Sequence, residues 1–362
     1  MKSERLYFID IVRAFAILMM LQGHFIDTLL AEEFRDPNNP IYAVWSYFRG
    51  ITAPTFFTIS GLIFTYLLLK AKTKGNEIER IKKGFSRGLF LIIVGYLLRA
   101  PIFKWLTGKF DTYFLVIDVL QCIGLSLILI VLLYVISLKK TTFFSYLMLV
   151  LGILIFMTEP LYRDLNLENV PLFFSNYITK SNGSVFRIIP WFGYVAFGAF
   201  IATLFFKHLH KKHFKVITIV VFVVLGFTLI QYSSYFLAKL SILFNVDLFM
   251  KSASYNYLFT RFGNVLVYFA VFYSLENYLK FPLVLKIGQK TLSIYVIHFI
   301  IIYGSFTGFG LNRIIGKNLN PTEVTIGAIL FLITVCFISF YNVKTNTFIY
   351  QNLRKLFFKF KN

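Results

Sequence analysis

Hydrophobic residues in this chain gather in long runs that are separated by short polar and basic segments. Ten mostly apolar windows are each long enough to cross about 30 Å of hydrocarbon as a helix. They lie near residues 7–30, 41–69, 86–106, 113–138, 142–160, 188–206, 214–236, 255–279, 287–308 and 322–343. The pattern predicts an all-α integral membrane protein, a polytopic bundle of about ten transmembrane helices. The second window is long and contains Pro54, so we expect it to begin with a re-entrant or broken piece.

The composition agrees with a membrane location. Of the 362 residues, 58% are hydrophobic and 15% are charged, and the mean hydropathy is +0.72. Soluble proteins carry about 25% charged residues. The net charge of +21 lies in short loops between apolar runs. Lysine and arginine in such loops orient helices beside anionic lipid, so we predict the lipid bilayer as a partner and exclude nucleic acid.

The distribution of lysine and arginine predicts the topology. One alternating set of connections holds 23 of the 37 basic residues, the other set holds 12, and Arg13 and Arg49 lie inside windows. Because the basic loops stay in the cytoplasm, both termini are expected there. The chain is predicted to be a multi-pass protein of the cytoplasmic (plasma) membrane. The first window is interrupted by Asp10 and Arg13 and precedes no cleavage site, so we expect it to be retained as a helix.

The first window also carries a polar stripe. Arg13 and His24 are eleven residues apart, close to three helical turns, so their side chains project from nearly the same face. Asp10 lies one turn before Arg13, and Asp27 lies one turn after His24. Ionisable groups inside a membrane are costly and mark substrate or proton pathways. The stripe therefore predicts a functional path that faces protein or water.

The two central residues of the stripe each have two interpretations. Arg13, near the cytoplasmic mouth, can bind a phosphate or carboxylate in bidentate fashion, or it forms a structural ion pair with Asp10. His24, about 16 Å further along the helix axis, can act as a general base or carry an acyl group. The alternative interpretation is that His24 is a structural histidine, buried and with its hydrogen bonds satisfied. The shared face and the polar flanks favour function.

Three further candidates lie where windows meet the predicted outer surface. Asp118 and Gln121 share a face at the start of the fourth window, at a depth comparable with that of His24. We expect Asp118 either to orient His24 or to be solvated at the surface. Trp191 follows Pro190 at an aromatic-belt position, where anchoring is the favoured role and acceptor contact the alternative.

The ninth window enters from the cytoplasm and carries Tyr295 and His298 one turn apart, so both side chains can line one path. We expect His298 at about the depth of Arg13. The three histidines of the 207–213 loop lie among lysines, whose charge opposes a divalent cation. We therefore predict no metal site.

Four motifs, taken in order, resemble the transmembrane acyltransferase superfamily. They are residues 9–18 with the Arg–x10–His spacing, 57–61, 118–125 and 292–298. The Arg–x10–His pair and the Tyr-x-x-His helix are similar to the acyltransferase-three family of bacterial O-acetyltransferases. The Val-Leu-Gln-x-Ile-Gly-Leu element and the Ile-Pro-Trp-x-Gly segment are more similar to bacterial relatives of heparan-α-glucosaminide N-acetyltransferase, the closer kin. Ala14 and Cys122 stand where many relatives have glycine and arginine.

The resemblance implies an enzyme, a membrane-embedded acyltransferase formed by a single domain over residues 1–362. The donor would be cytoplasmic acetyl-CoA or another acyl-CoA, which the basic loops would concentrate. The acceptor would be a saccharide or glycolipid at the outer face, modified by O- or N-acetylation in a bacterial inner membrane. The resemblance leaves open direct transfer or an acyl-histidine intermediate, and the oligomeric state, with a homodimer as one option.

We therefore predict a site with three sets of residues. The catalytic set is His24, Asp118 and Asp27; the donor-binding set is Arg13, Asp10, Arg49, Tyr295 and His298; and the substrate-binding set is Gln121 and Trp191.

Two other functions compete with acyl transfer. A transporter or flippase for a lipid-linked saccharide or small anion would bind the headgroup through Arg13, Arg49 and Asp10 and relay protons through His24. A catalytically inactive scaffold would neither bind a donor nor transport. Binding or hydrolysis of acyl-CoA by the purified protein separates the first function from the other two.

Overall fold

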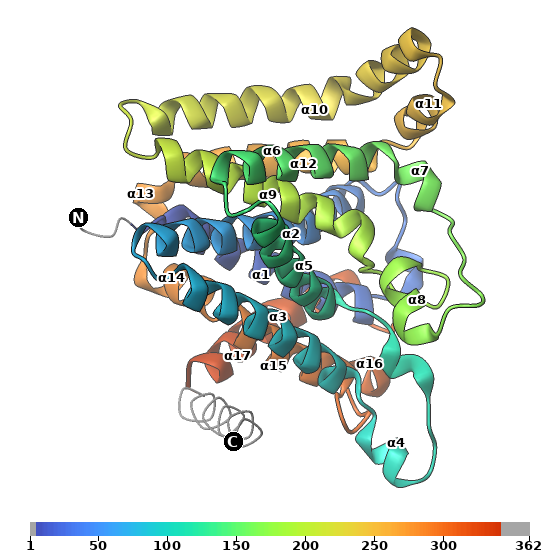
Figure 1. Cartoon of the computed structure of the whole chain (residues 1–362). Helices are drawn as coiled ribbons and strands as arrows, with labels where there is room; N and C mark the ends of the chain where they lie inside the picture. The colour runs from blue at the N-terminus through green and yellow to red at the C-terminus, as the bar shows by residue number, and fades with distance from the viewer. Residues whose placement is uncertain (1–4, 342–362) are drawn as a thin grey trace, which may run out of the picture. The chain divides into compact units, whose positions relative to one another are not determined.

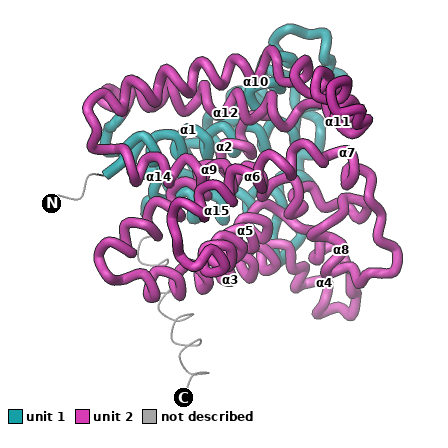
Figure 2. The backbone as a smooth tube through the Cα atoms, turned by 45° about the horizontal axis from the view of Figure 1, so that its top comes forward, with its two compact units in different colours: residues 1–49, 280–362 teal, residues 50–279 magenta. Residues whose placement is uncertain are grey.

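The computed structural model describes residues 5–341, and the chain divides into two compact units (Figures 1 and 2). Unit 1 comprises residues 1–49 and 280–362, and unit 2 comprises residues 50–279. Within the described range every regular element is a helix, so the predicted all-α class is confirmed. The single-domain arrangement remains a prediction.

Unit 1 combines the beginning of the chain with its end. Its elements are α1 (Tyr7–Leu29), the 3-10 helix η1 (Glu32–Phe34), the first part of α2 (Pro40–Thr73), α14 (Pro282–Gln289), α15 (Thr291–Tyr303), α16 (Leu311–Ile314) and α17 (Pro321–Tyr341). Helix α1 packs against α14, α15 and α17. The helix that carries the polar stripe therefore packs against three helices from the C-terminal part of the chain.

Unit 2 holds the helices from the middle of the sequence. They are the remainder of α2, α3 (Glu77–Arg99), α4 (Ile102–Leu106), η2 (Thr112–Leu115), α5 (Val119–Ile136), α6 (Thr141–Met157), α7 (Glu159–Tyr162), α8 (Leu172–Ile178), α9 (Ile188–His208), α10 (Phe214–Phe244), α11 (Asp247–Ser254), α12 (Tyr257–Ser274) and α13 (Glu276–Leu279). The main packed pairs are α3 with α5, α6 with α9, and α10 with α12.

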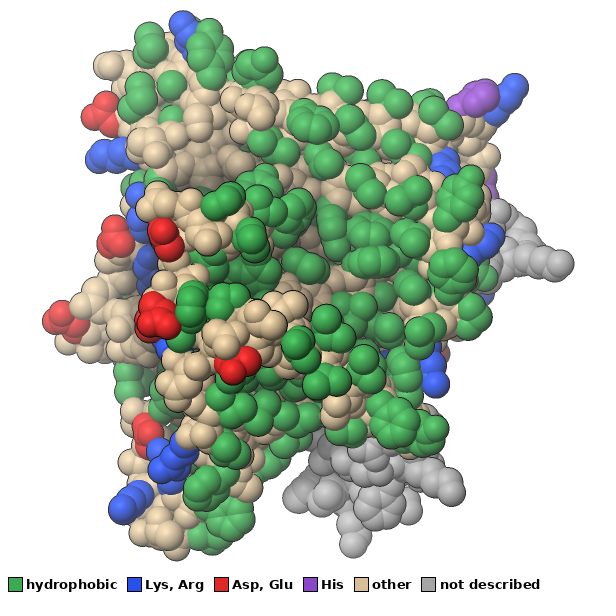
Figure 3. All heavy atoms as spheres, turned by 180° about the vertical axis from the view of Figure 1, so that it is seen from behind, with side chains coloured by type: hydrophobic (Ala, Val, Ile, Leu, Met, Phe, Trp, Pro, Cys, Tyr) green, Lys and Arg blue, Asp and Glu red, His purple; other side chains and the backbone are tan. Residues whose placement is uncertain are grey.

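Six helices of the described residues are long and apolar enough to cross a membrane, which indicates a membrane protein. A seventh span is present if α14 and α15, bent by 69°, count as one. The predicted count of about ten is not confirmed, because the windows near 86–106, 142–160 and 255–279 contain helices that are short or charged at one end. The second window is one continuous helix, α2, with Pro54 inside it, rather than a broken piece. The face drawn in Figure 3 is largely covered by hydrophobic side chains.

Glycine allows α2 and α9 to touch at the backbone. A Cβ atom placed on Gly61 would collide with the carbonyl oxygen of Val195, and one placed on Gly198 would collide with the carbonyl oxygen of Thr58. Backbones approach this closely only where small residues remove the intervening side chain. The role that the structure shows for Gly61 is therefore packing.

We expect Gly198→Ala to destabilise the protein. Alanine is better than glycine in a helix by about 1 kcal/mol, but here the new methyl group would force two backbones apart, and overpacking costs about 1–3 kcal/mol. The midpoint of thermal unfolding in detergent should fall. Gly327→Ala is the matched control, because its Cβ would meet only the ring of Phe25, which can move. An equal effect of both substitutions would contradict this explanation.

Candidate functional site

His24 lies on α1 and faces α15 within unit 1. Its Nδ1 is 2.9 Å from the hydroxyl oxygen of Tyr303. Its ring centroid is 5.3 Å from that of His298, and the two imidazole planes are inclined by 36°. A hydrogen bond to one ring nitrogen fixes the orientation of an imidazole and selects its tautomer. His24 is thus an oriented group, and Tyr303 is the residue that orients it.

His298 is buried beside His24 and completes this cluster. The ring of Tyr295 meets it edge-on with centroids 4.8 Å apart, so the pair predicted to line one path does lie together. The expectation that His298 would be at the depth of Arg13 is wrong. Helix α15 begins at Thr291, and this first residue already lies at the level of Arg13, with which it shares a hydrogen bond. His298 is seven residues further along that helix, about 10 Å, and reaches the level of His24.

Arg13 anchors the opposite end of the stripe. Its Nη2 donates a hydrogen bond of 2.6 Å to the Thr291 hydroxyl, while its Nη1 is 3.8 Å from Oδ1 of Asp10. Asp10 is held more closely by Arg5, whose Nη2 and Nε lie 2.6 and 3.0 Å from Oδ2. One carboxylate is therefore shared by two guanidinium groups. The cluster keeps a net positive charge that favours an anionic ligand.

The break between α14 and α15 explains how Thr291 reaches Arg13. Helix α14 ends at Gln289, and α15 starts two residues later at an angle of 69°. A Cβ on Gly288 would collide with the Asp10 carbonyl oxygen, so α14 touches the backbone of α1 at that point. This contact places the first turn of α15, with Thr291, beside Arg13.

A second ion pair lies beyond His24. Arg49 on α2 pairs with Asp27, one turn after His24 on α1. Its guanidinium lies 5.9 Å from the Trp45 ring centroid, and the Trp45 indole donates a 2.8 Å hydrogen bond to the Gln22 amide oxygen. Arg49 on α2 therefore lies beside the C-terminal end of α1, whereas Arg13 lies near its N-terminal end. The sequence had assigned both arginines to the donor-binding set.

The far end of α1 is tied to the segment that precedes α17. The Ala31 amide donates to the Leu319 carbonyl at 3.0 Å, and the Leu319 amide donates to the Leu29 carbonyl at 2.9 Å. Nearby, the ammonium of Lys317 donates to the Glu32 carboxylate, and this hydrogen bond lowers the pKa of Glu32. These contacts join the C-terminal end of α1, the end that carries His24, to the segment before α17.

Asp118 and Gln121 belong to unit 2, where they start α5. The Asp118 carboxylate accepts hydrogen bonds at the helix start, and the Gln121 side chain accepts a 3.2 Å hydrogen bond from the Asp118 amide. This reciprocal arrangement is a capping box. Arg99 adds a 3.0 Å ion pair to Asp118. The partners of Asp118 that the structure shows are thus a helix terminus and an arginine, and its role toward His24 remains a prediction.

Trp191 lies in an aromatic cluster of unit 2. Its indole donates a 3.1 Å hydrogen bond to the Val185 carbonyl, and its ring lies 4.9 Å from those of Phe57 and Phe186. These contacts hold the tryptophan at the start of α9. Its anchoring at the membrane interface and its contact with an acceptor both remain predictions.

Sequence reasoning missed Arg5, Thr291 and Tyr303. A signal for Tyr303 existed, because it lies eight residues after Tyr295 and so continues the same face of the helix. Thr291 could be found only once the helix start was known. Within residues 5–341, no group of three or more His, Cys, Asp and Glu side chains is placed to hold a metal ion.

Comparison with known proteins identifies a family for this chain. The profile of the family described as heparan-alpha-glucosaminide N-acetyltransferase, catalytic, matches residues 5–235. The matched range includes Arg13 and His24 and ends before α15. A search among curated proteins finds no match. Because the profile covers more than half of the chain, the protein belongs to the heparan-alpha-glucosaminide N-acetyltransferase catalytic family.

Proposed function

We propose that the protein is an acetyltransferase of the membrane that moves an acetyl group from cytoplasmic acetyl-CoA to a saccharide or glycolipid acceptor at the outer face. The family match supports acetyl transfer to a saccharide. The observation that carries the proposal is the arrangement along α1. A cationic cluster at Arg13 and an oriented histidine at His24 lie on one helix, about 16 Å apart.

The donor end requires groups that hold an anion. The guanidinium of Arg13 and the hydroxyl of Thr291, joined by a 2.6 Å hydrogen bond, both offer donors to phosphate or to a thioester carbonyl. Arg5 adds a second guanidinium through Asp10. Arginine is suited to this role because its planar fork matches phosphate oxygens in pairs. Acetyl-CoA supplies the activated acetyl group, and this cluster fits its anionic part.

The transfer end requires a base. When Nδ1–H of His24 donates to the hydroxyl oxygen of Tyr303, the lone pair of the imidazole is on Nε2. That nitrogen can take a proton from the acceptor amine or hydroxyl, or can carry the acetyl group before the acceptor arrives. The polar residues beyond His24, Asp27 and Arg49, form an ion pair and line the side from which an acceptor would approach.

The proposal is tested with purified full-length protein and radiolabelled acetyl-CoA. We expect saturable binding of acetyl-CoA and release of CoA that depends on an added glucosamine-terminated saccharide. Both readouts follow from a donor cluster and a base in one unit. Folded protein that neither binds acetyl-CoA nor releases CoA would contradict the proposal. Uptake of the saccharide into vesicles without acetyl-CoA would favour a transporter instead.

A further inference from the structure

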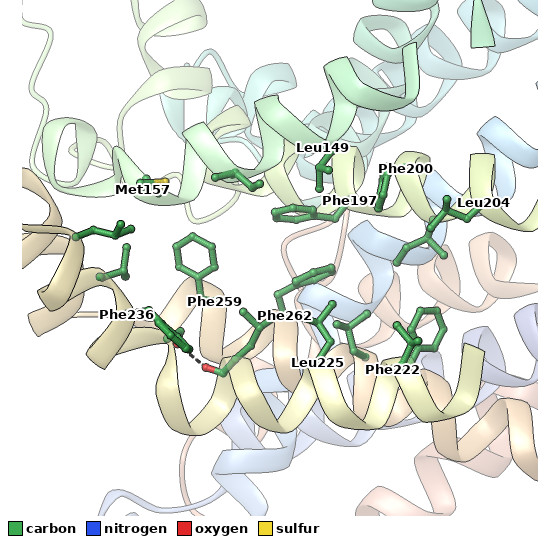
Figure 4. A pocket seen from close by; sticks show the side chains of 18 residues that line it. Leu149, Met157, Phe197, Phe200, Leu204, Phe222, Leu225, Phe236, Phe259 and Phe262 are labelled. Carbon is green, nitrogen blue, oxygen red and sulfur yellow. Dashed lines mark hydrogen bonds between the residues drawn. The ribbon is translucent and has the colours of Figure 1, made fainter. Parts of the chain in front are cut away.

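An apolar groove lies within unit 2 (Figure 4). It has a volume of about 400 Å³ and lies between two helix pairs, α6 with α9 and α10 with α12. A Cβ on Gly226 would lie 2.9 Å from the Gly263 carbonyl oxygen, so α10 and α12 touch at the backbone. No glycine of the described residues makes such an approach between the two pairs, and the groove remains there.

The lining of the groove is hydrocarbon and aromatic rings. Phe197 and Phe262 stack with their centroids 4.3 Å apart, one from each helix pair. Ser233 is the single polar lining residue. Its hydroxyl donates to the Leu229 carbonyl of its own helix and accepts a 2.6 Å hydrogen bond from Asn256. The groove therefore offers a ligand no hydrogen bond and suits a purely apolar one.

The dimensions fit a single hydrocarbon chain. The lining on α10 extends from Val221 to Leu240, about 28 Å of helix. Spread along that length, a volume of about 400 Å³ forms a long slot and not a wide cavity. A helix, about 10 Å wide, is too large for this slot, which excludes a helical segment of a second copy as the occupant. The lining residues Leu204, Val221 and Leu225 are exposed, so the groove opens at the surface of the protein.

Basic residues lie at one end of the groove. The lining residue Leu204 is followed one turn later on α9 by Lys207. Phe222 is preceded two turns earlier on α10 by Lys215, which is 3.3 Å from Glu276. Lys207 and its neighbour Lys211 in the connecting loop are exposed. Ammonium groups at the mouth of an apolar slot complement a molecule with a hydrocarbon tail and an anionic head.

We propose that this groove binds one acyl chain of an anionic phospholipid from the surrounding bilayer, with the phosphate at Lys207 and Lys211. None of the residues assigned to acetyl transfer lines this groove. It would place a lipid chain against the lining face of α10, a helix whose apolar stretch is only 17% buried.

The proposal is tested by photo-crosslinking. Full-length protein is reconstituted in vesicles that contain phosphatidylglycerol with a diazirine in the middle of one acyl chain, and the crosslinked residues are mapped by mass spectrometry. We expect more crosslinks at residues on the lining face of α10, such as Leu225, than at residues outside the lining, such as Val224. Leu225→Trp fills the groove and should abolish them. Val224→Trp, outside the lining, is the matched control and should leave them unchanged.

A second arm tests the charge. The double variant Lys207→Gln with Lys211→Gln should lower crosslinking of the phosphatidylglycerol probe by about 30-fold, because each lysine lost beside an anionic surface lowers binding by about fivefold. A phosphatidylcholine probe with the same chain should be unaffected by that change. Equal labelling of both faces of α10, or retention of the crosslinks in a folded Leu225→Trp protein, would overturn the proposal. Crosslinks that appear only with a polyprenyl phosphate probe would overturn the phospholipid as occupant.

Discussion

Replacing His24 with alanine is expected to lower acetyl transfer by about 10²-fold or more, the contribution of a positioned general base. His24 is the stripe residue whose unperturbed pKa lies near neutrality, and Tyr303 fixes its ring at 2.9 Å. Folding should survive, because one imidazole in a polar cluster contributes little packing. The measurement is the initial rate of CoA release, together with the amount of acetylated acceptor.

Tyr303→Phe is the matched variant for this prediction. It keeps the ring that packs on Phe299, 4.7 Å away between centroids, and removes only the hydroxyl that orients His24. We expect a smaller loss of about tenfold, the value of one hydrogen bond, and a changed pH profile of the rate. Acetyl-CoA binding should persist in both variants. Wild-type transfer by His24→Ala would make His298 the candidate base, at the same level of the membrane.

The polar stripe of α1 could be predicted from sequence because it depends only on helical periodicity. Positions three, four and eleven residues apart share a face in any α-helix, so the alignment of Arg13 with His24 needed no tertiary information. The partners of these residues could not be predicted in this way. Thr291 and Tyr303 come from a helix more than 250 residues away in sequence, and nothing in the local pattern encodes that contact.

Asp118 shows a different limit of sequence reasoning. An aspartate followed three residues later by glutamine at the start of an apolar run matches a capping box as well as a catalytic carboxylate. The structure shows the capping box and the ion pair with Arg99. Composition likewise predicted a membrane protein, whereas the count of about ten spans is not confirmed. Hydropathy windows do not show where a helix bends, as it does at Lys290 between α14 and α15.

Arg13→Lys is expected to weaken acetyl-CoA binding even though the positive charge is kept. The planar guanidinium can bond Thr291 and an anion at the same time, whereas a lysine ammonium is a compact point charge on a different stem. Loss of one charge-assisted hydrogen bond, about 1.5–3 kcal/mol, corresponds to a Kd higher by about tenfold or more. Isothermal titration calorimetry of the detergent-solubilised protein measures this change, and Arg13→Ala should show a larger one.

The control must separate a specific contact from a change in net charge. Lys83→Gln removes one positive charge from an exposed position that pairs with Glu79 on α3, so it should leave the Kd unchanged. Thr291→Ala should weaken binding less than Arg13→Ala, because it removes only the hydroxyl that steadies the guanidinium. Because His24 lies three turns away, none of these substitutions should change the pH profile of the transfer rate at saturating donor. Wild-type affinity in a folded Arg13→Ala protein would remove Arg13 from the donor site.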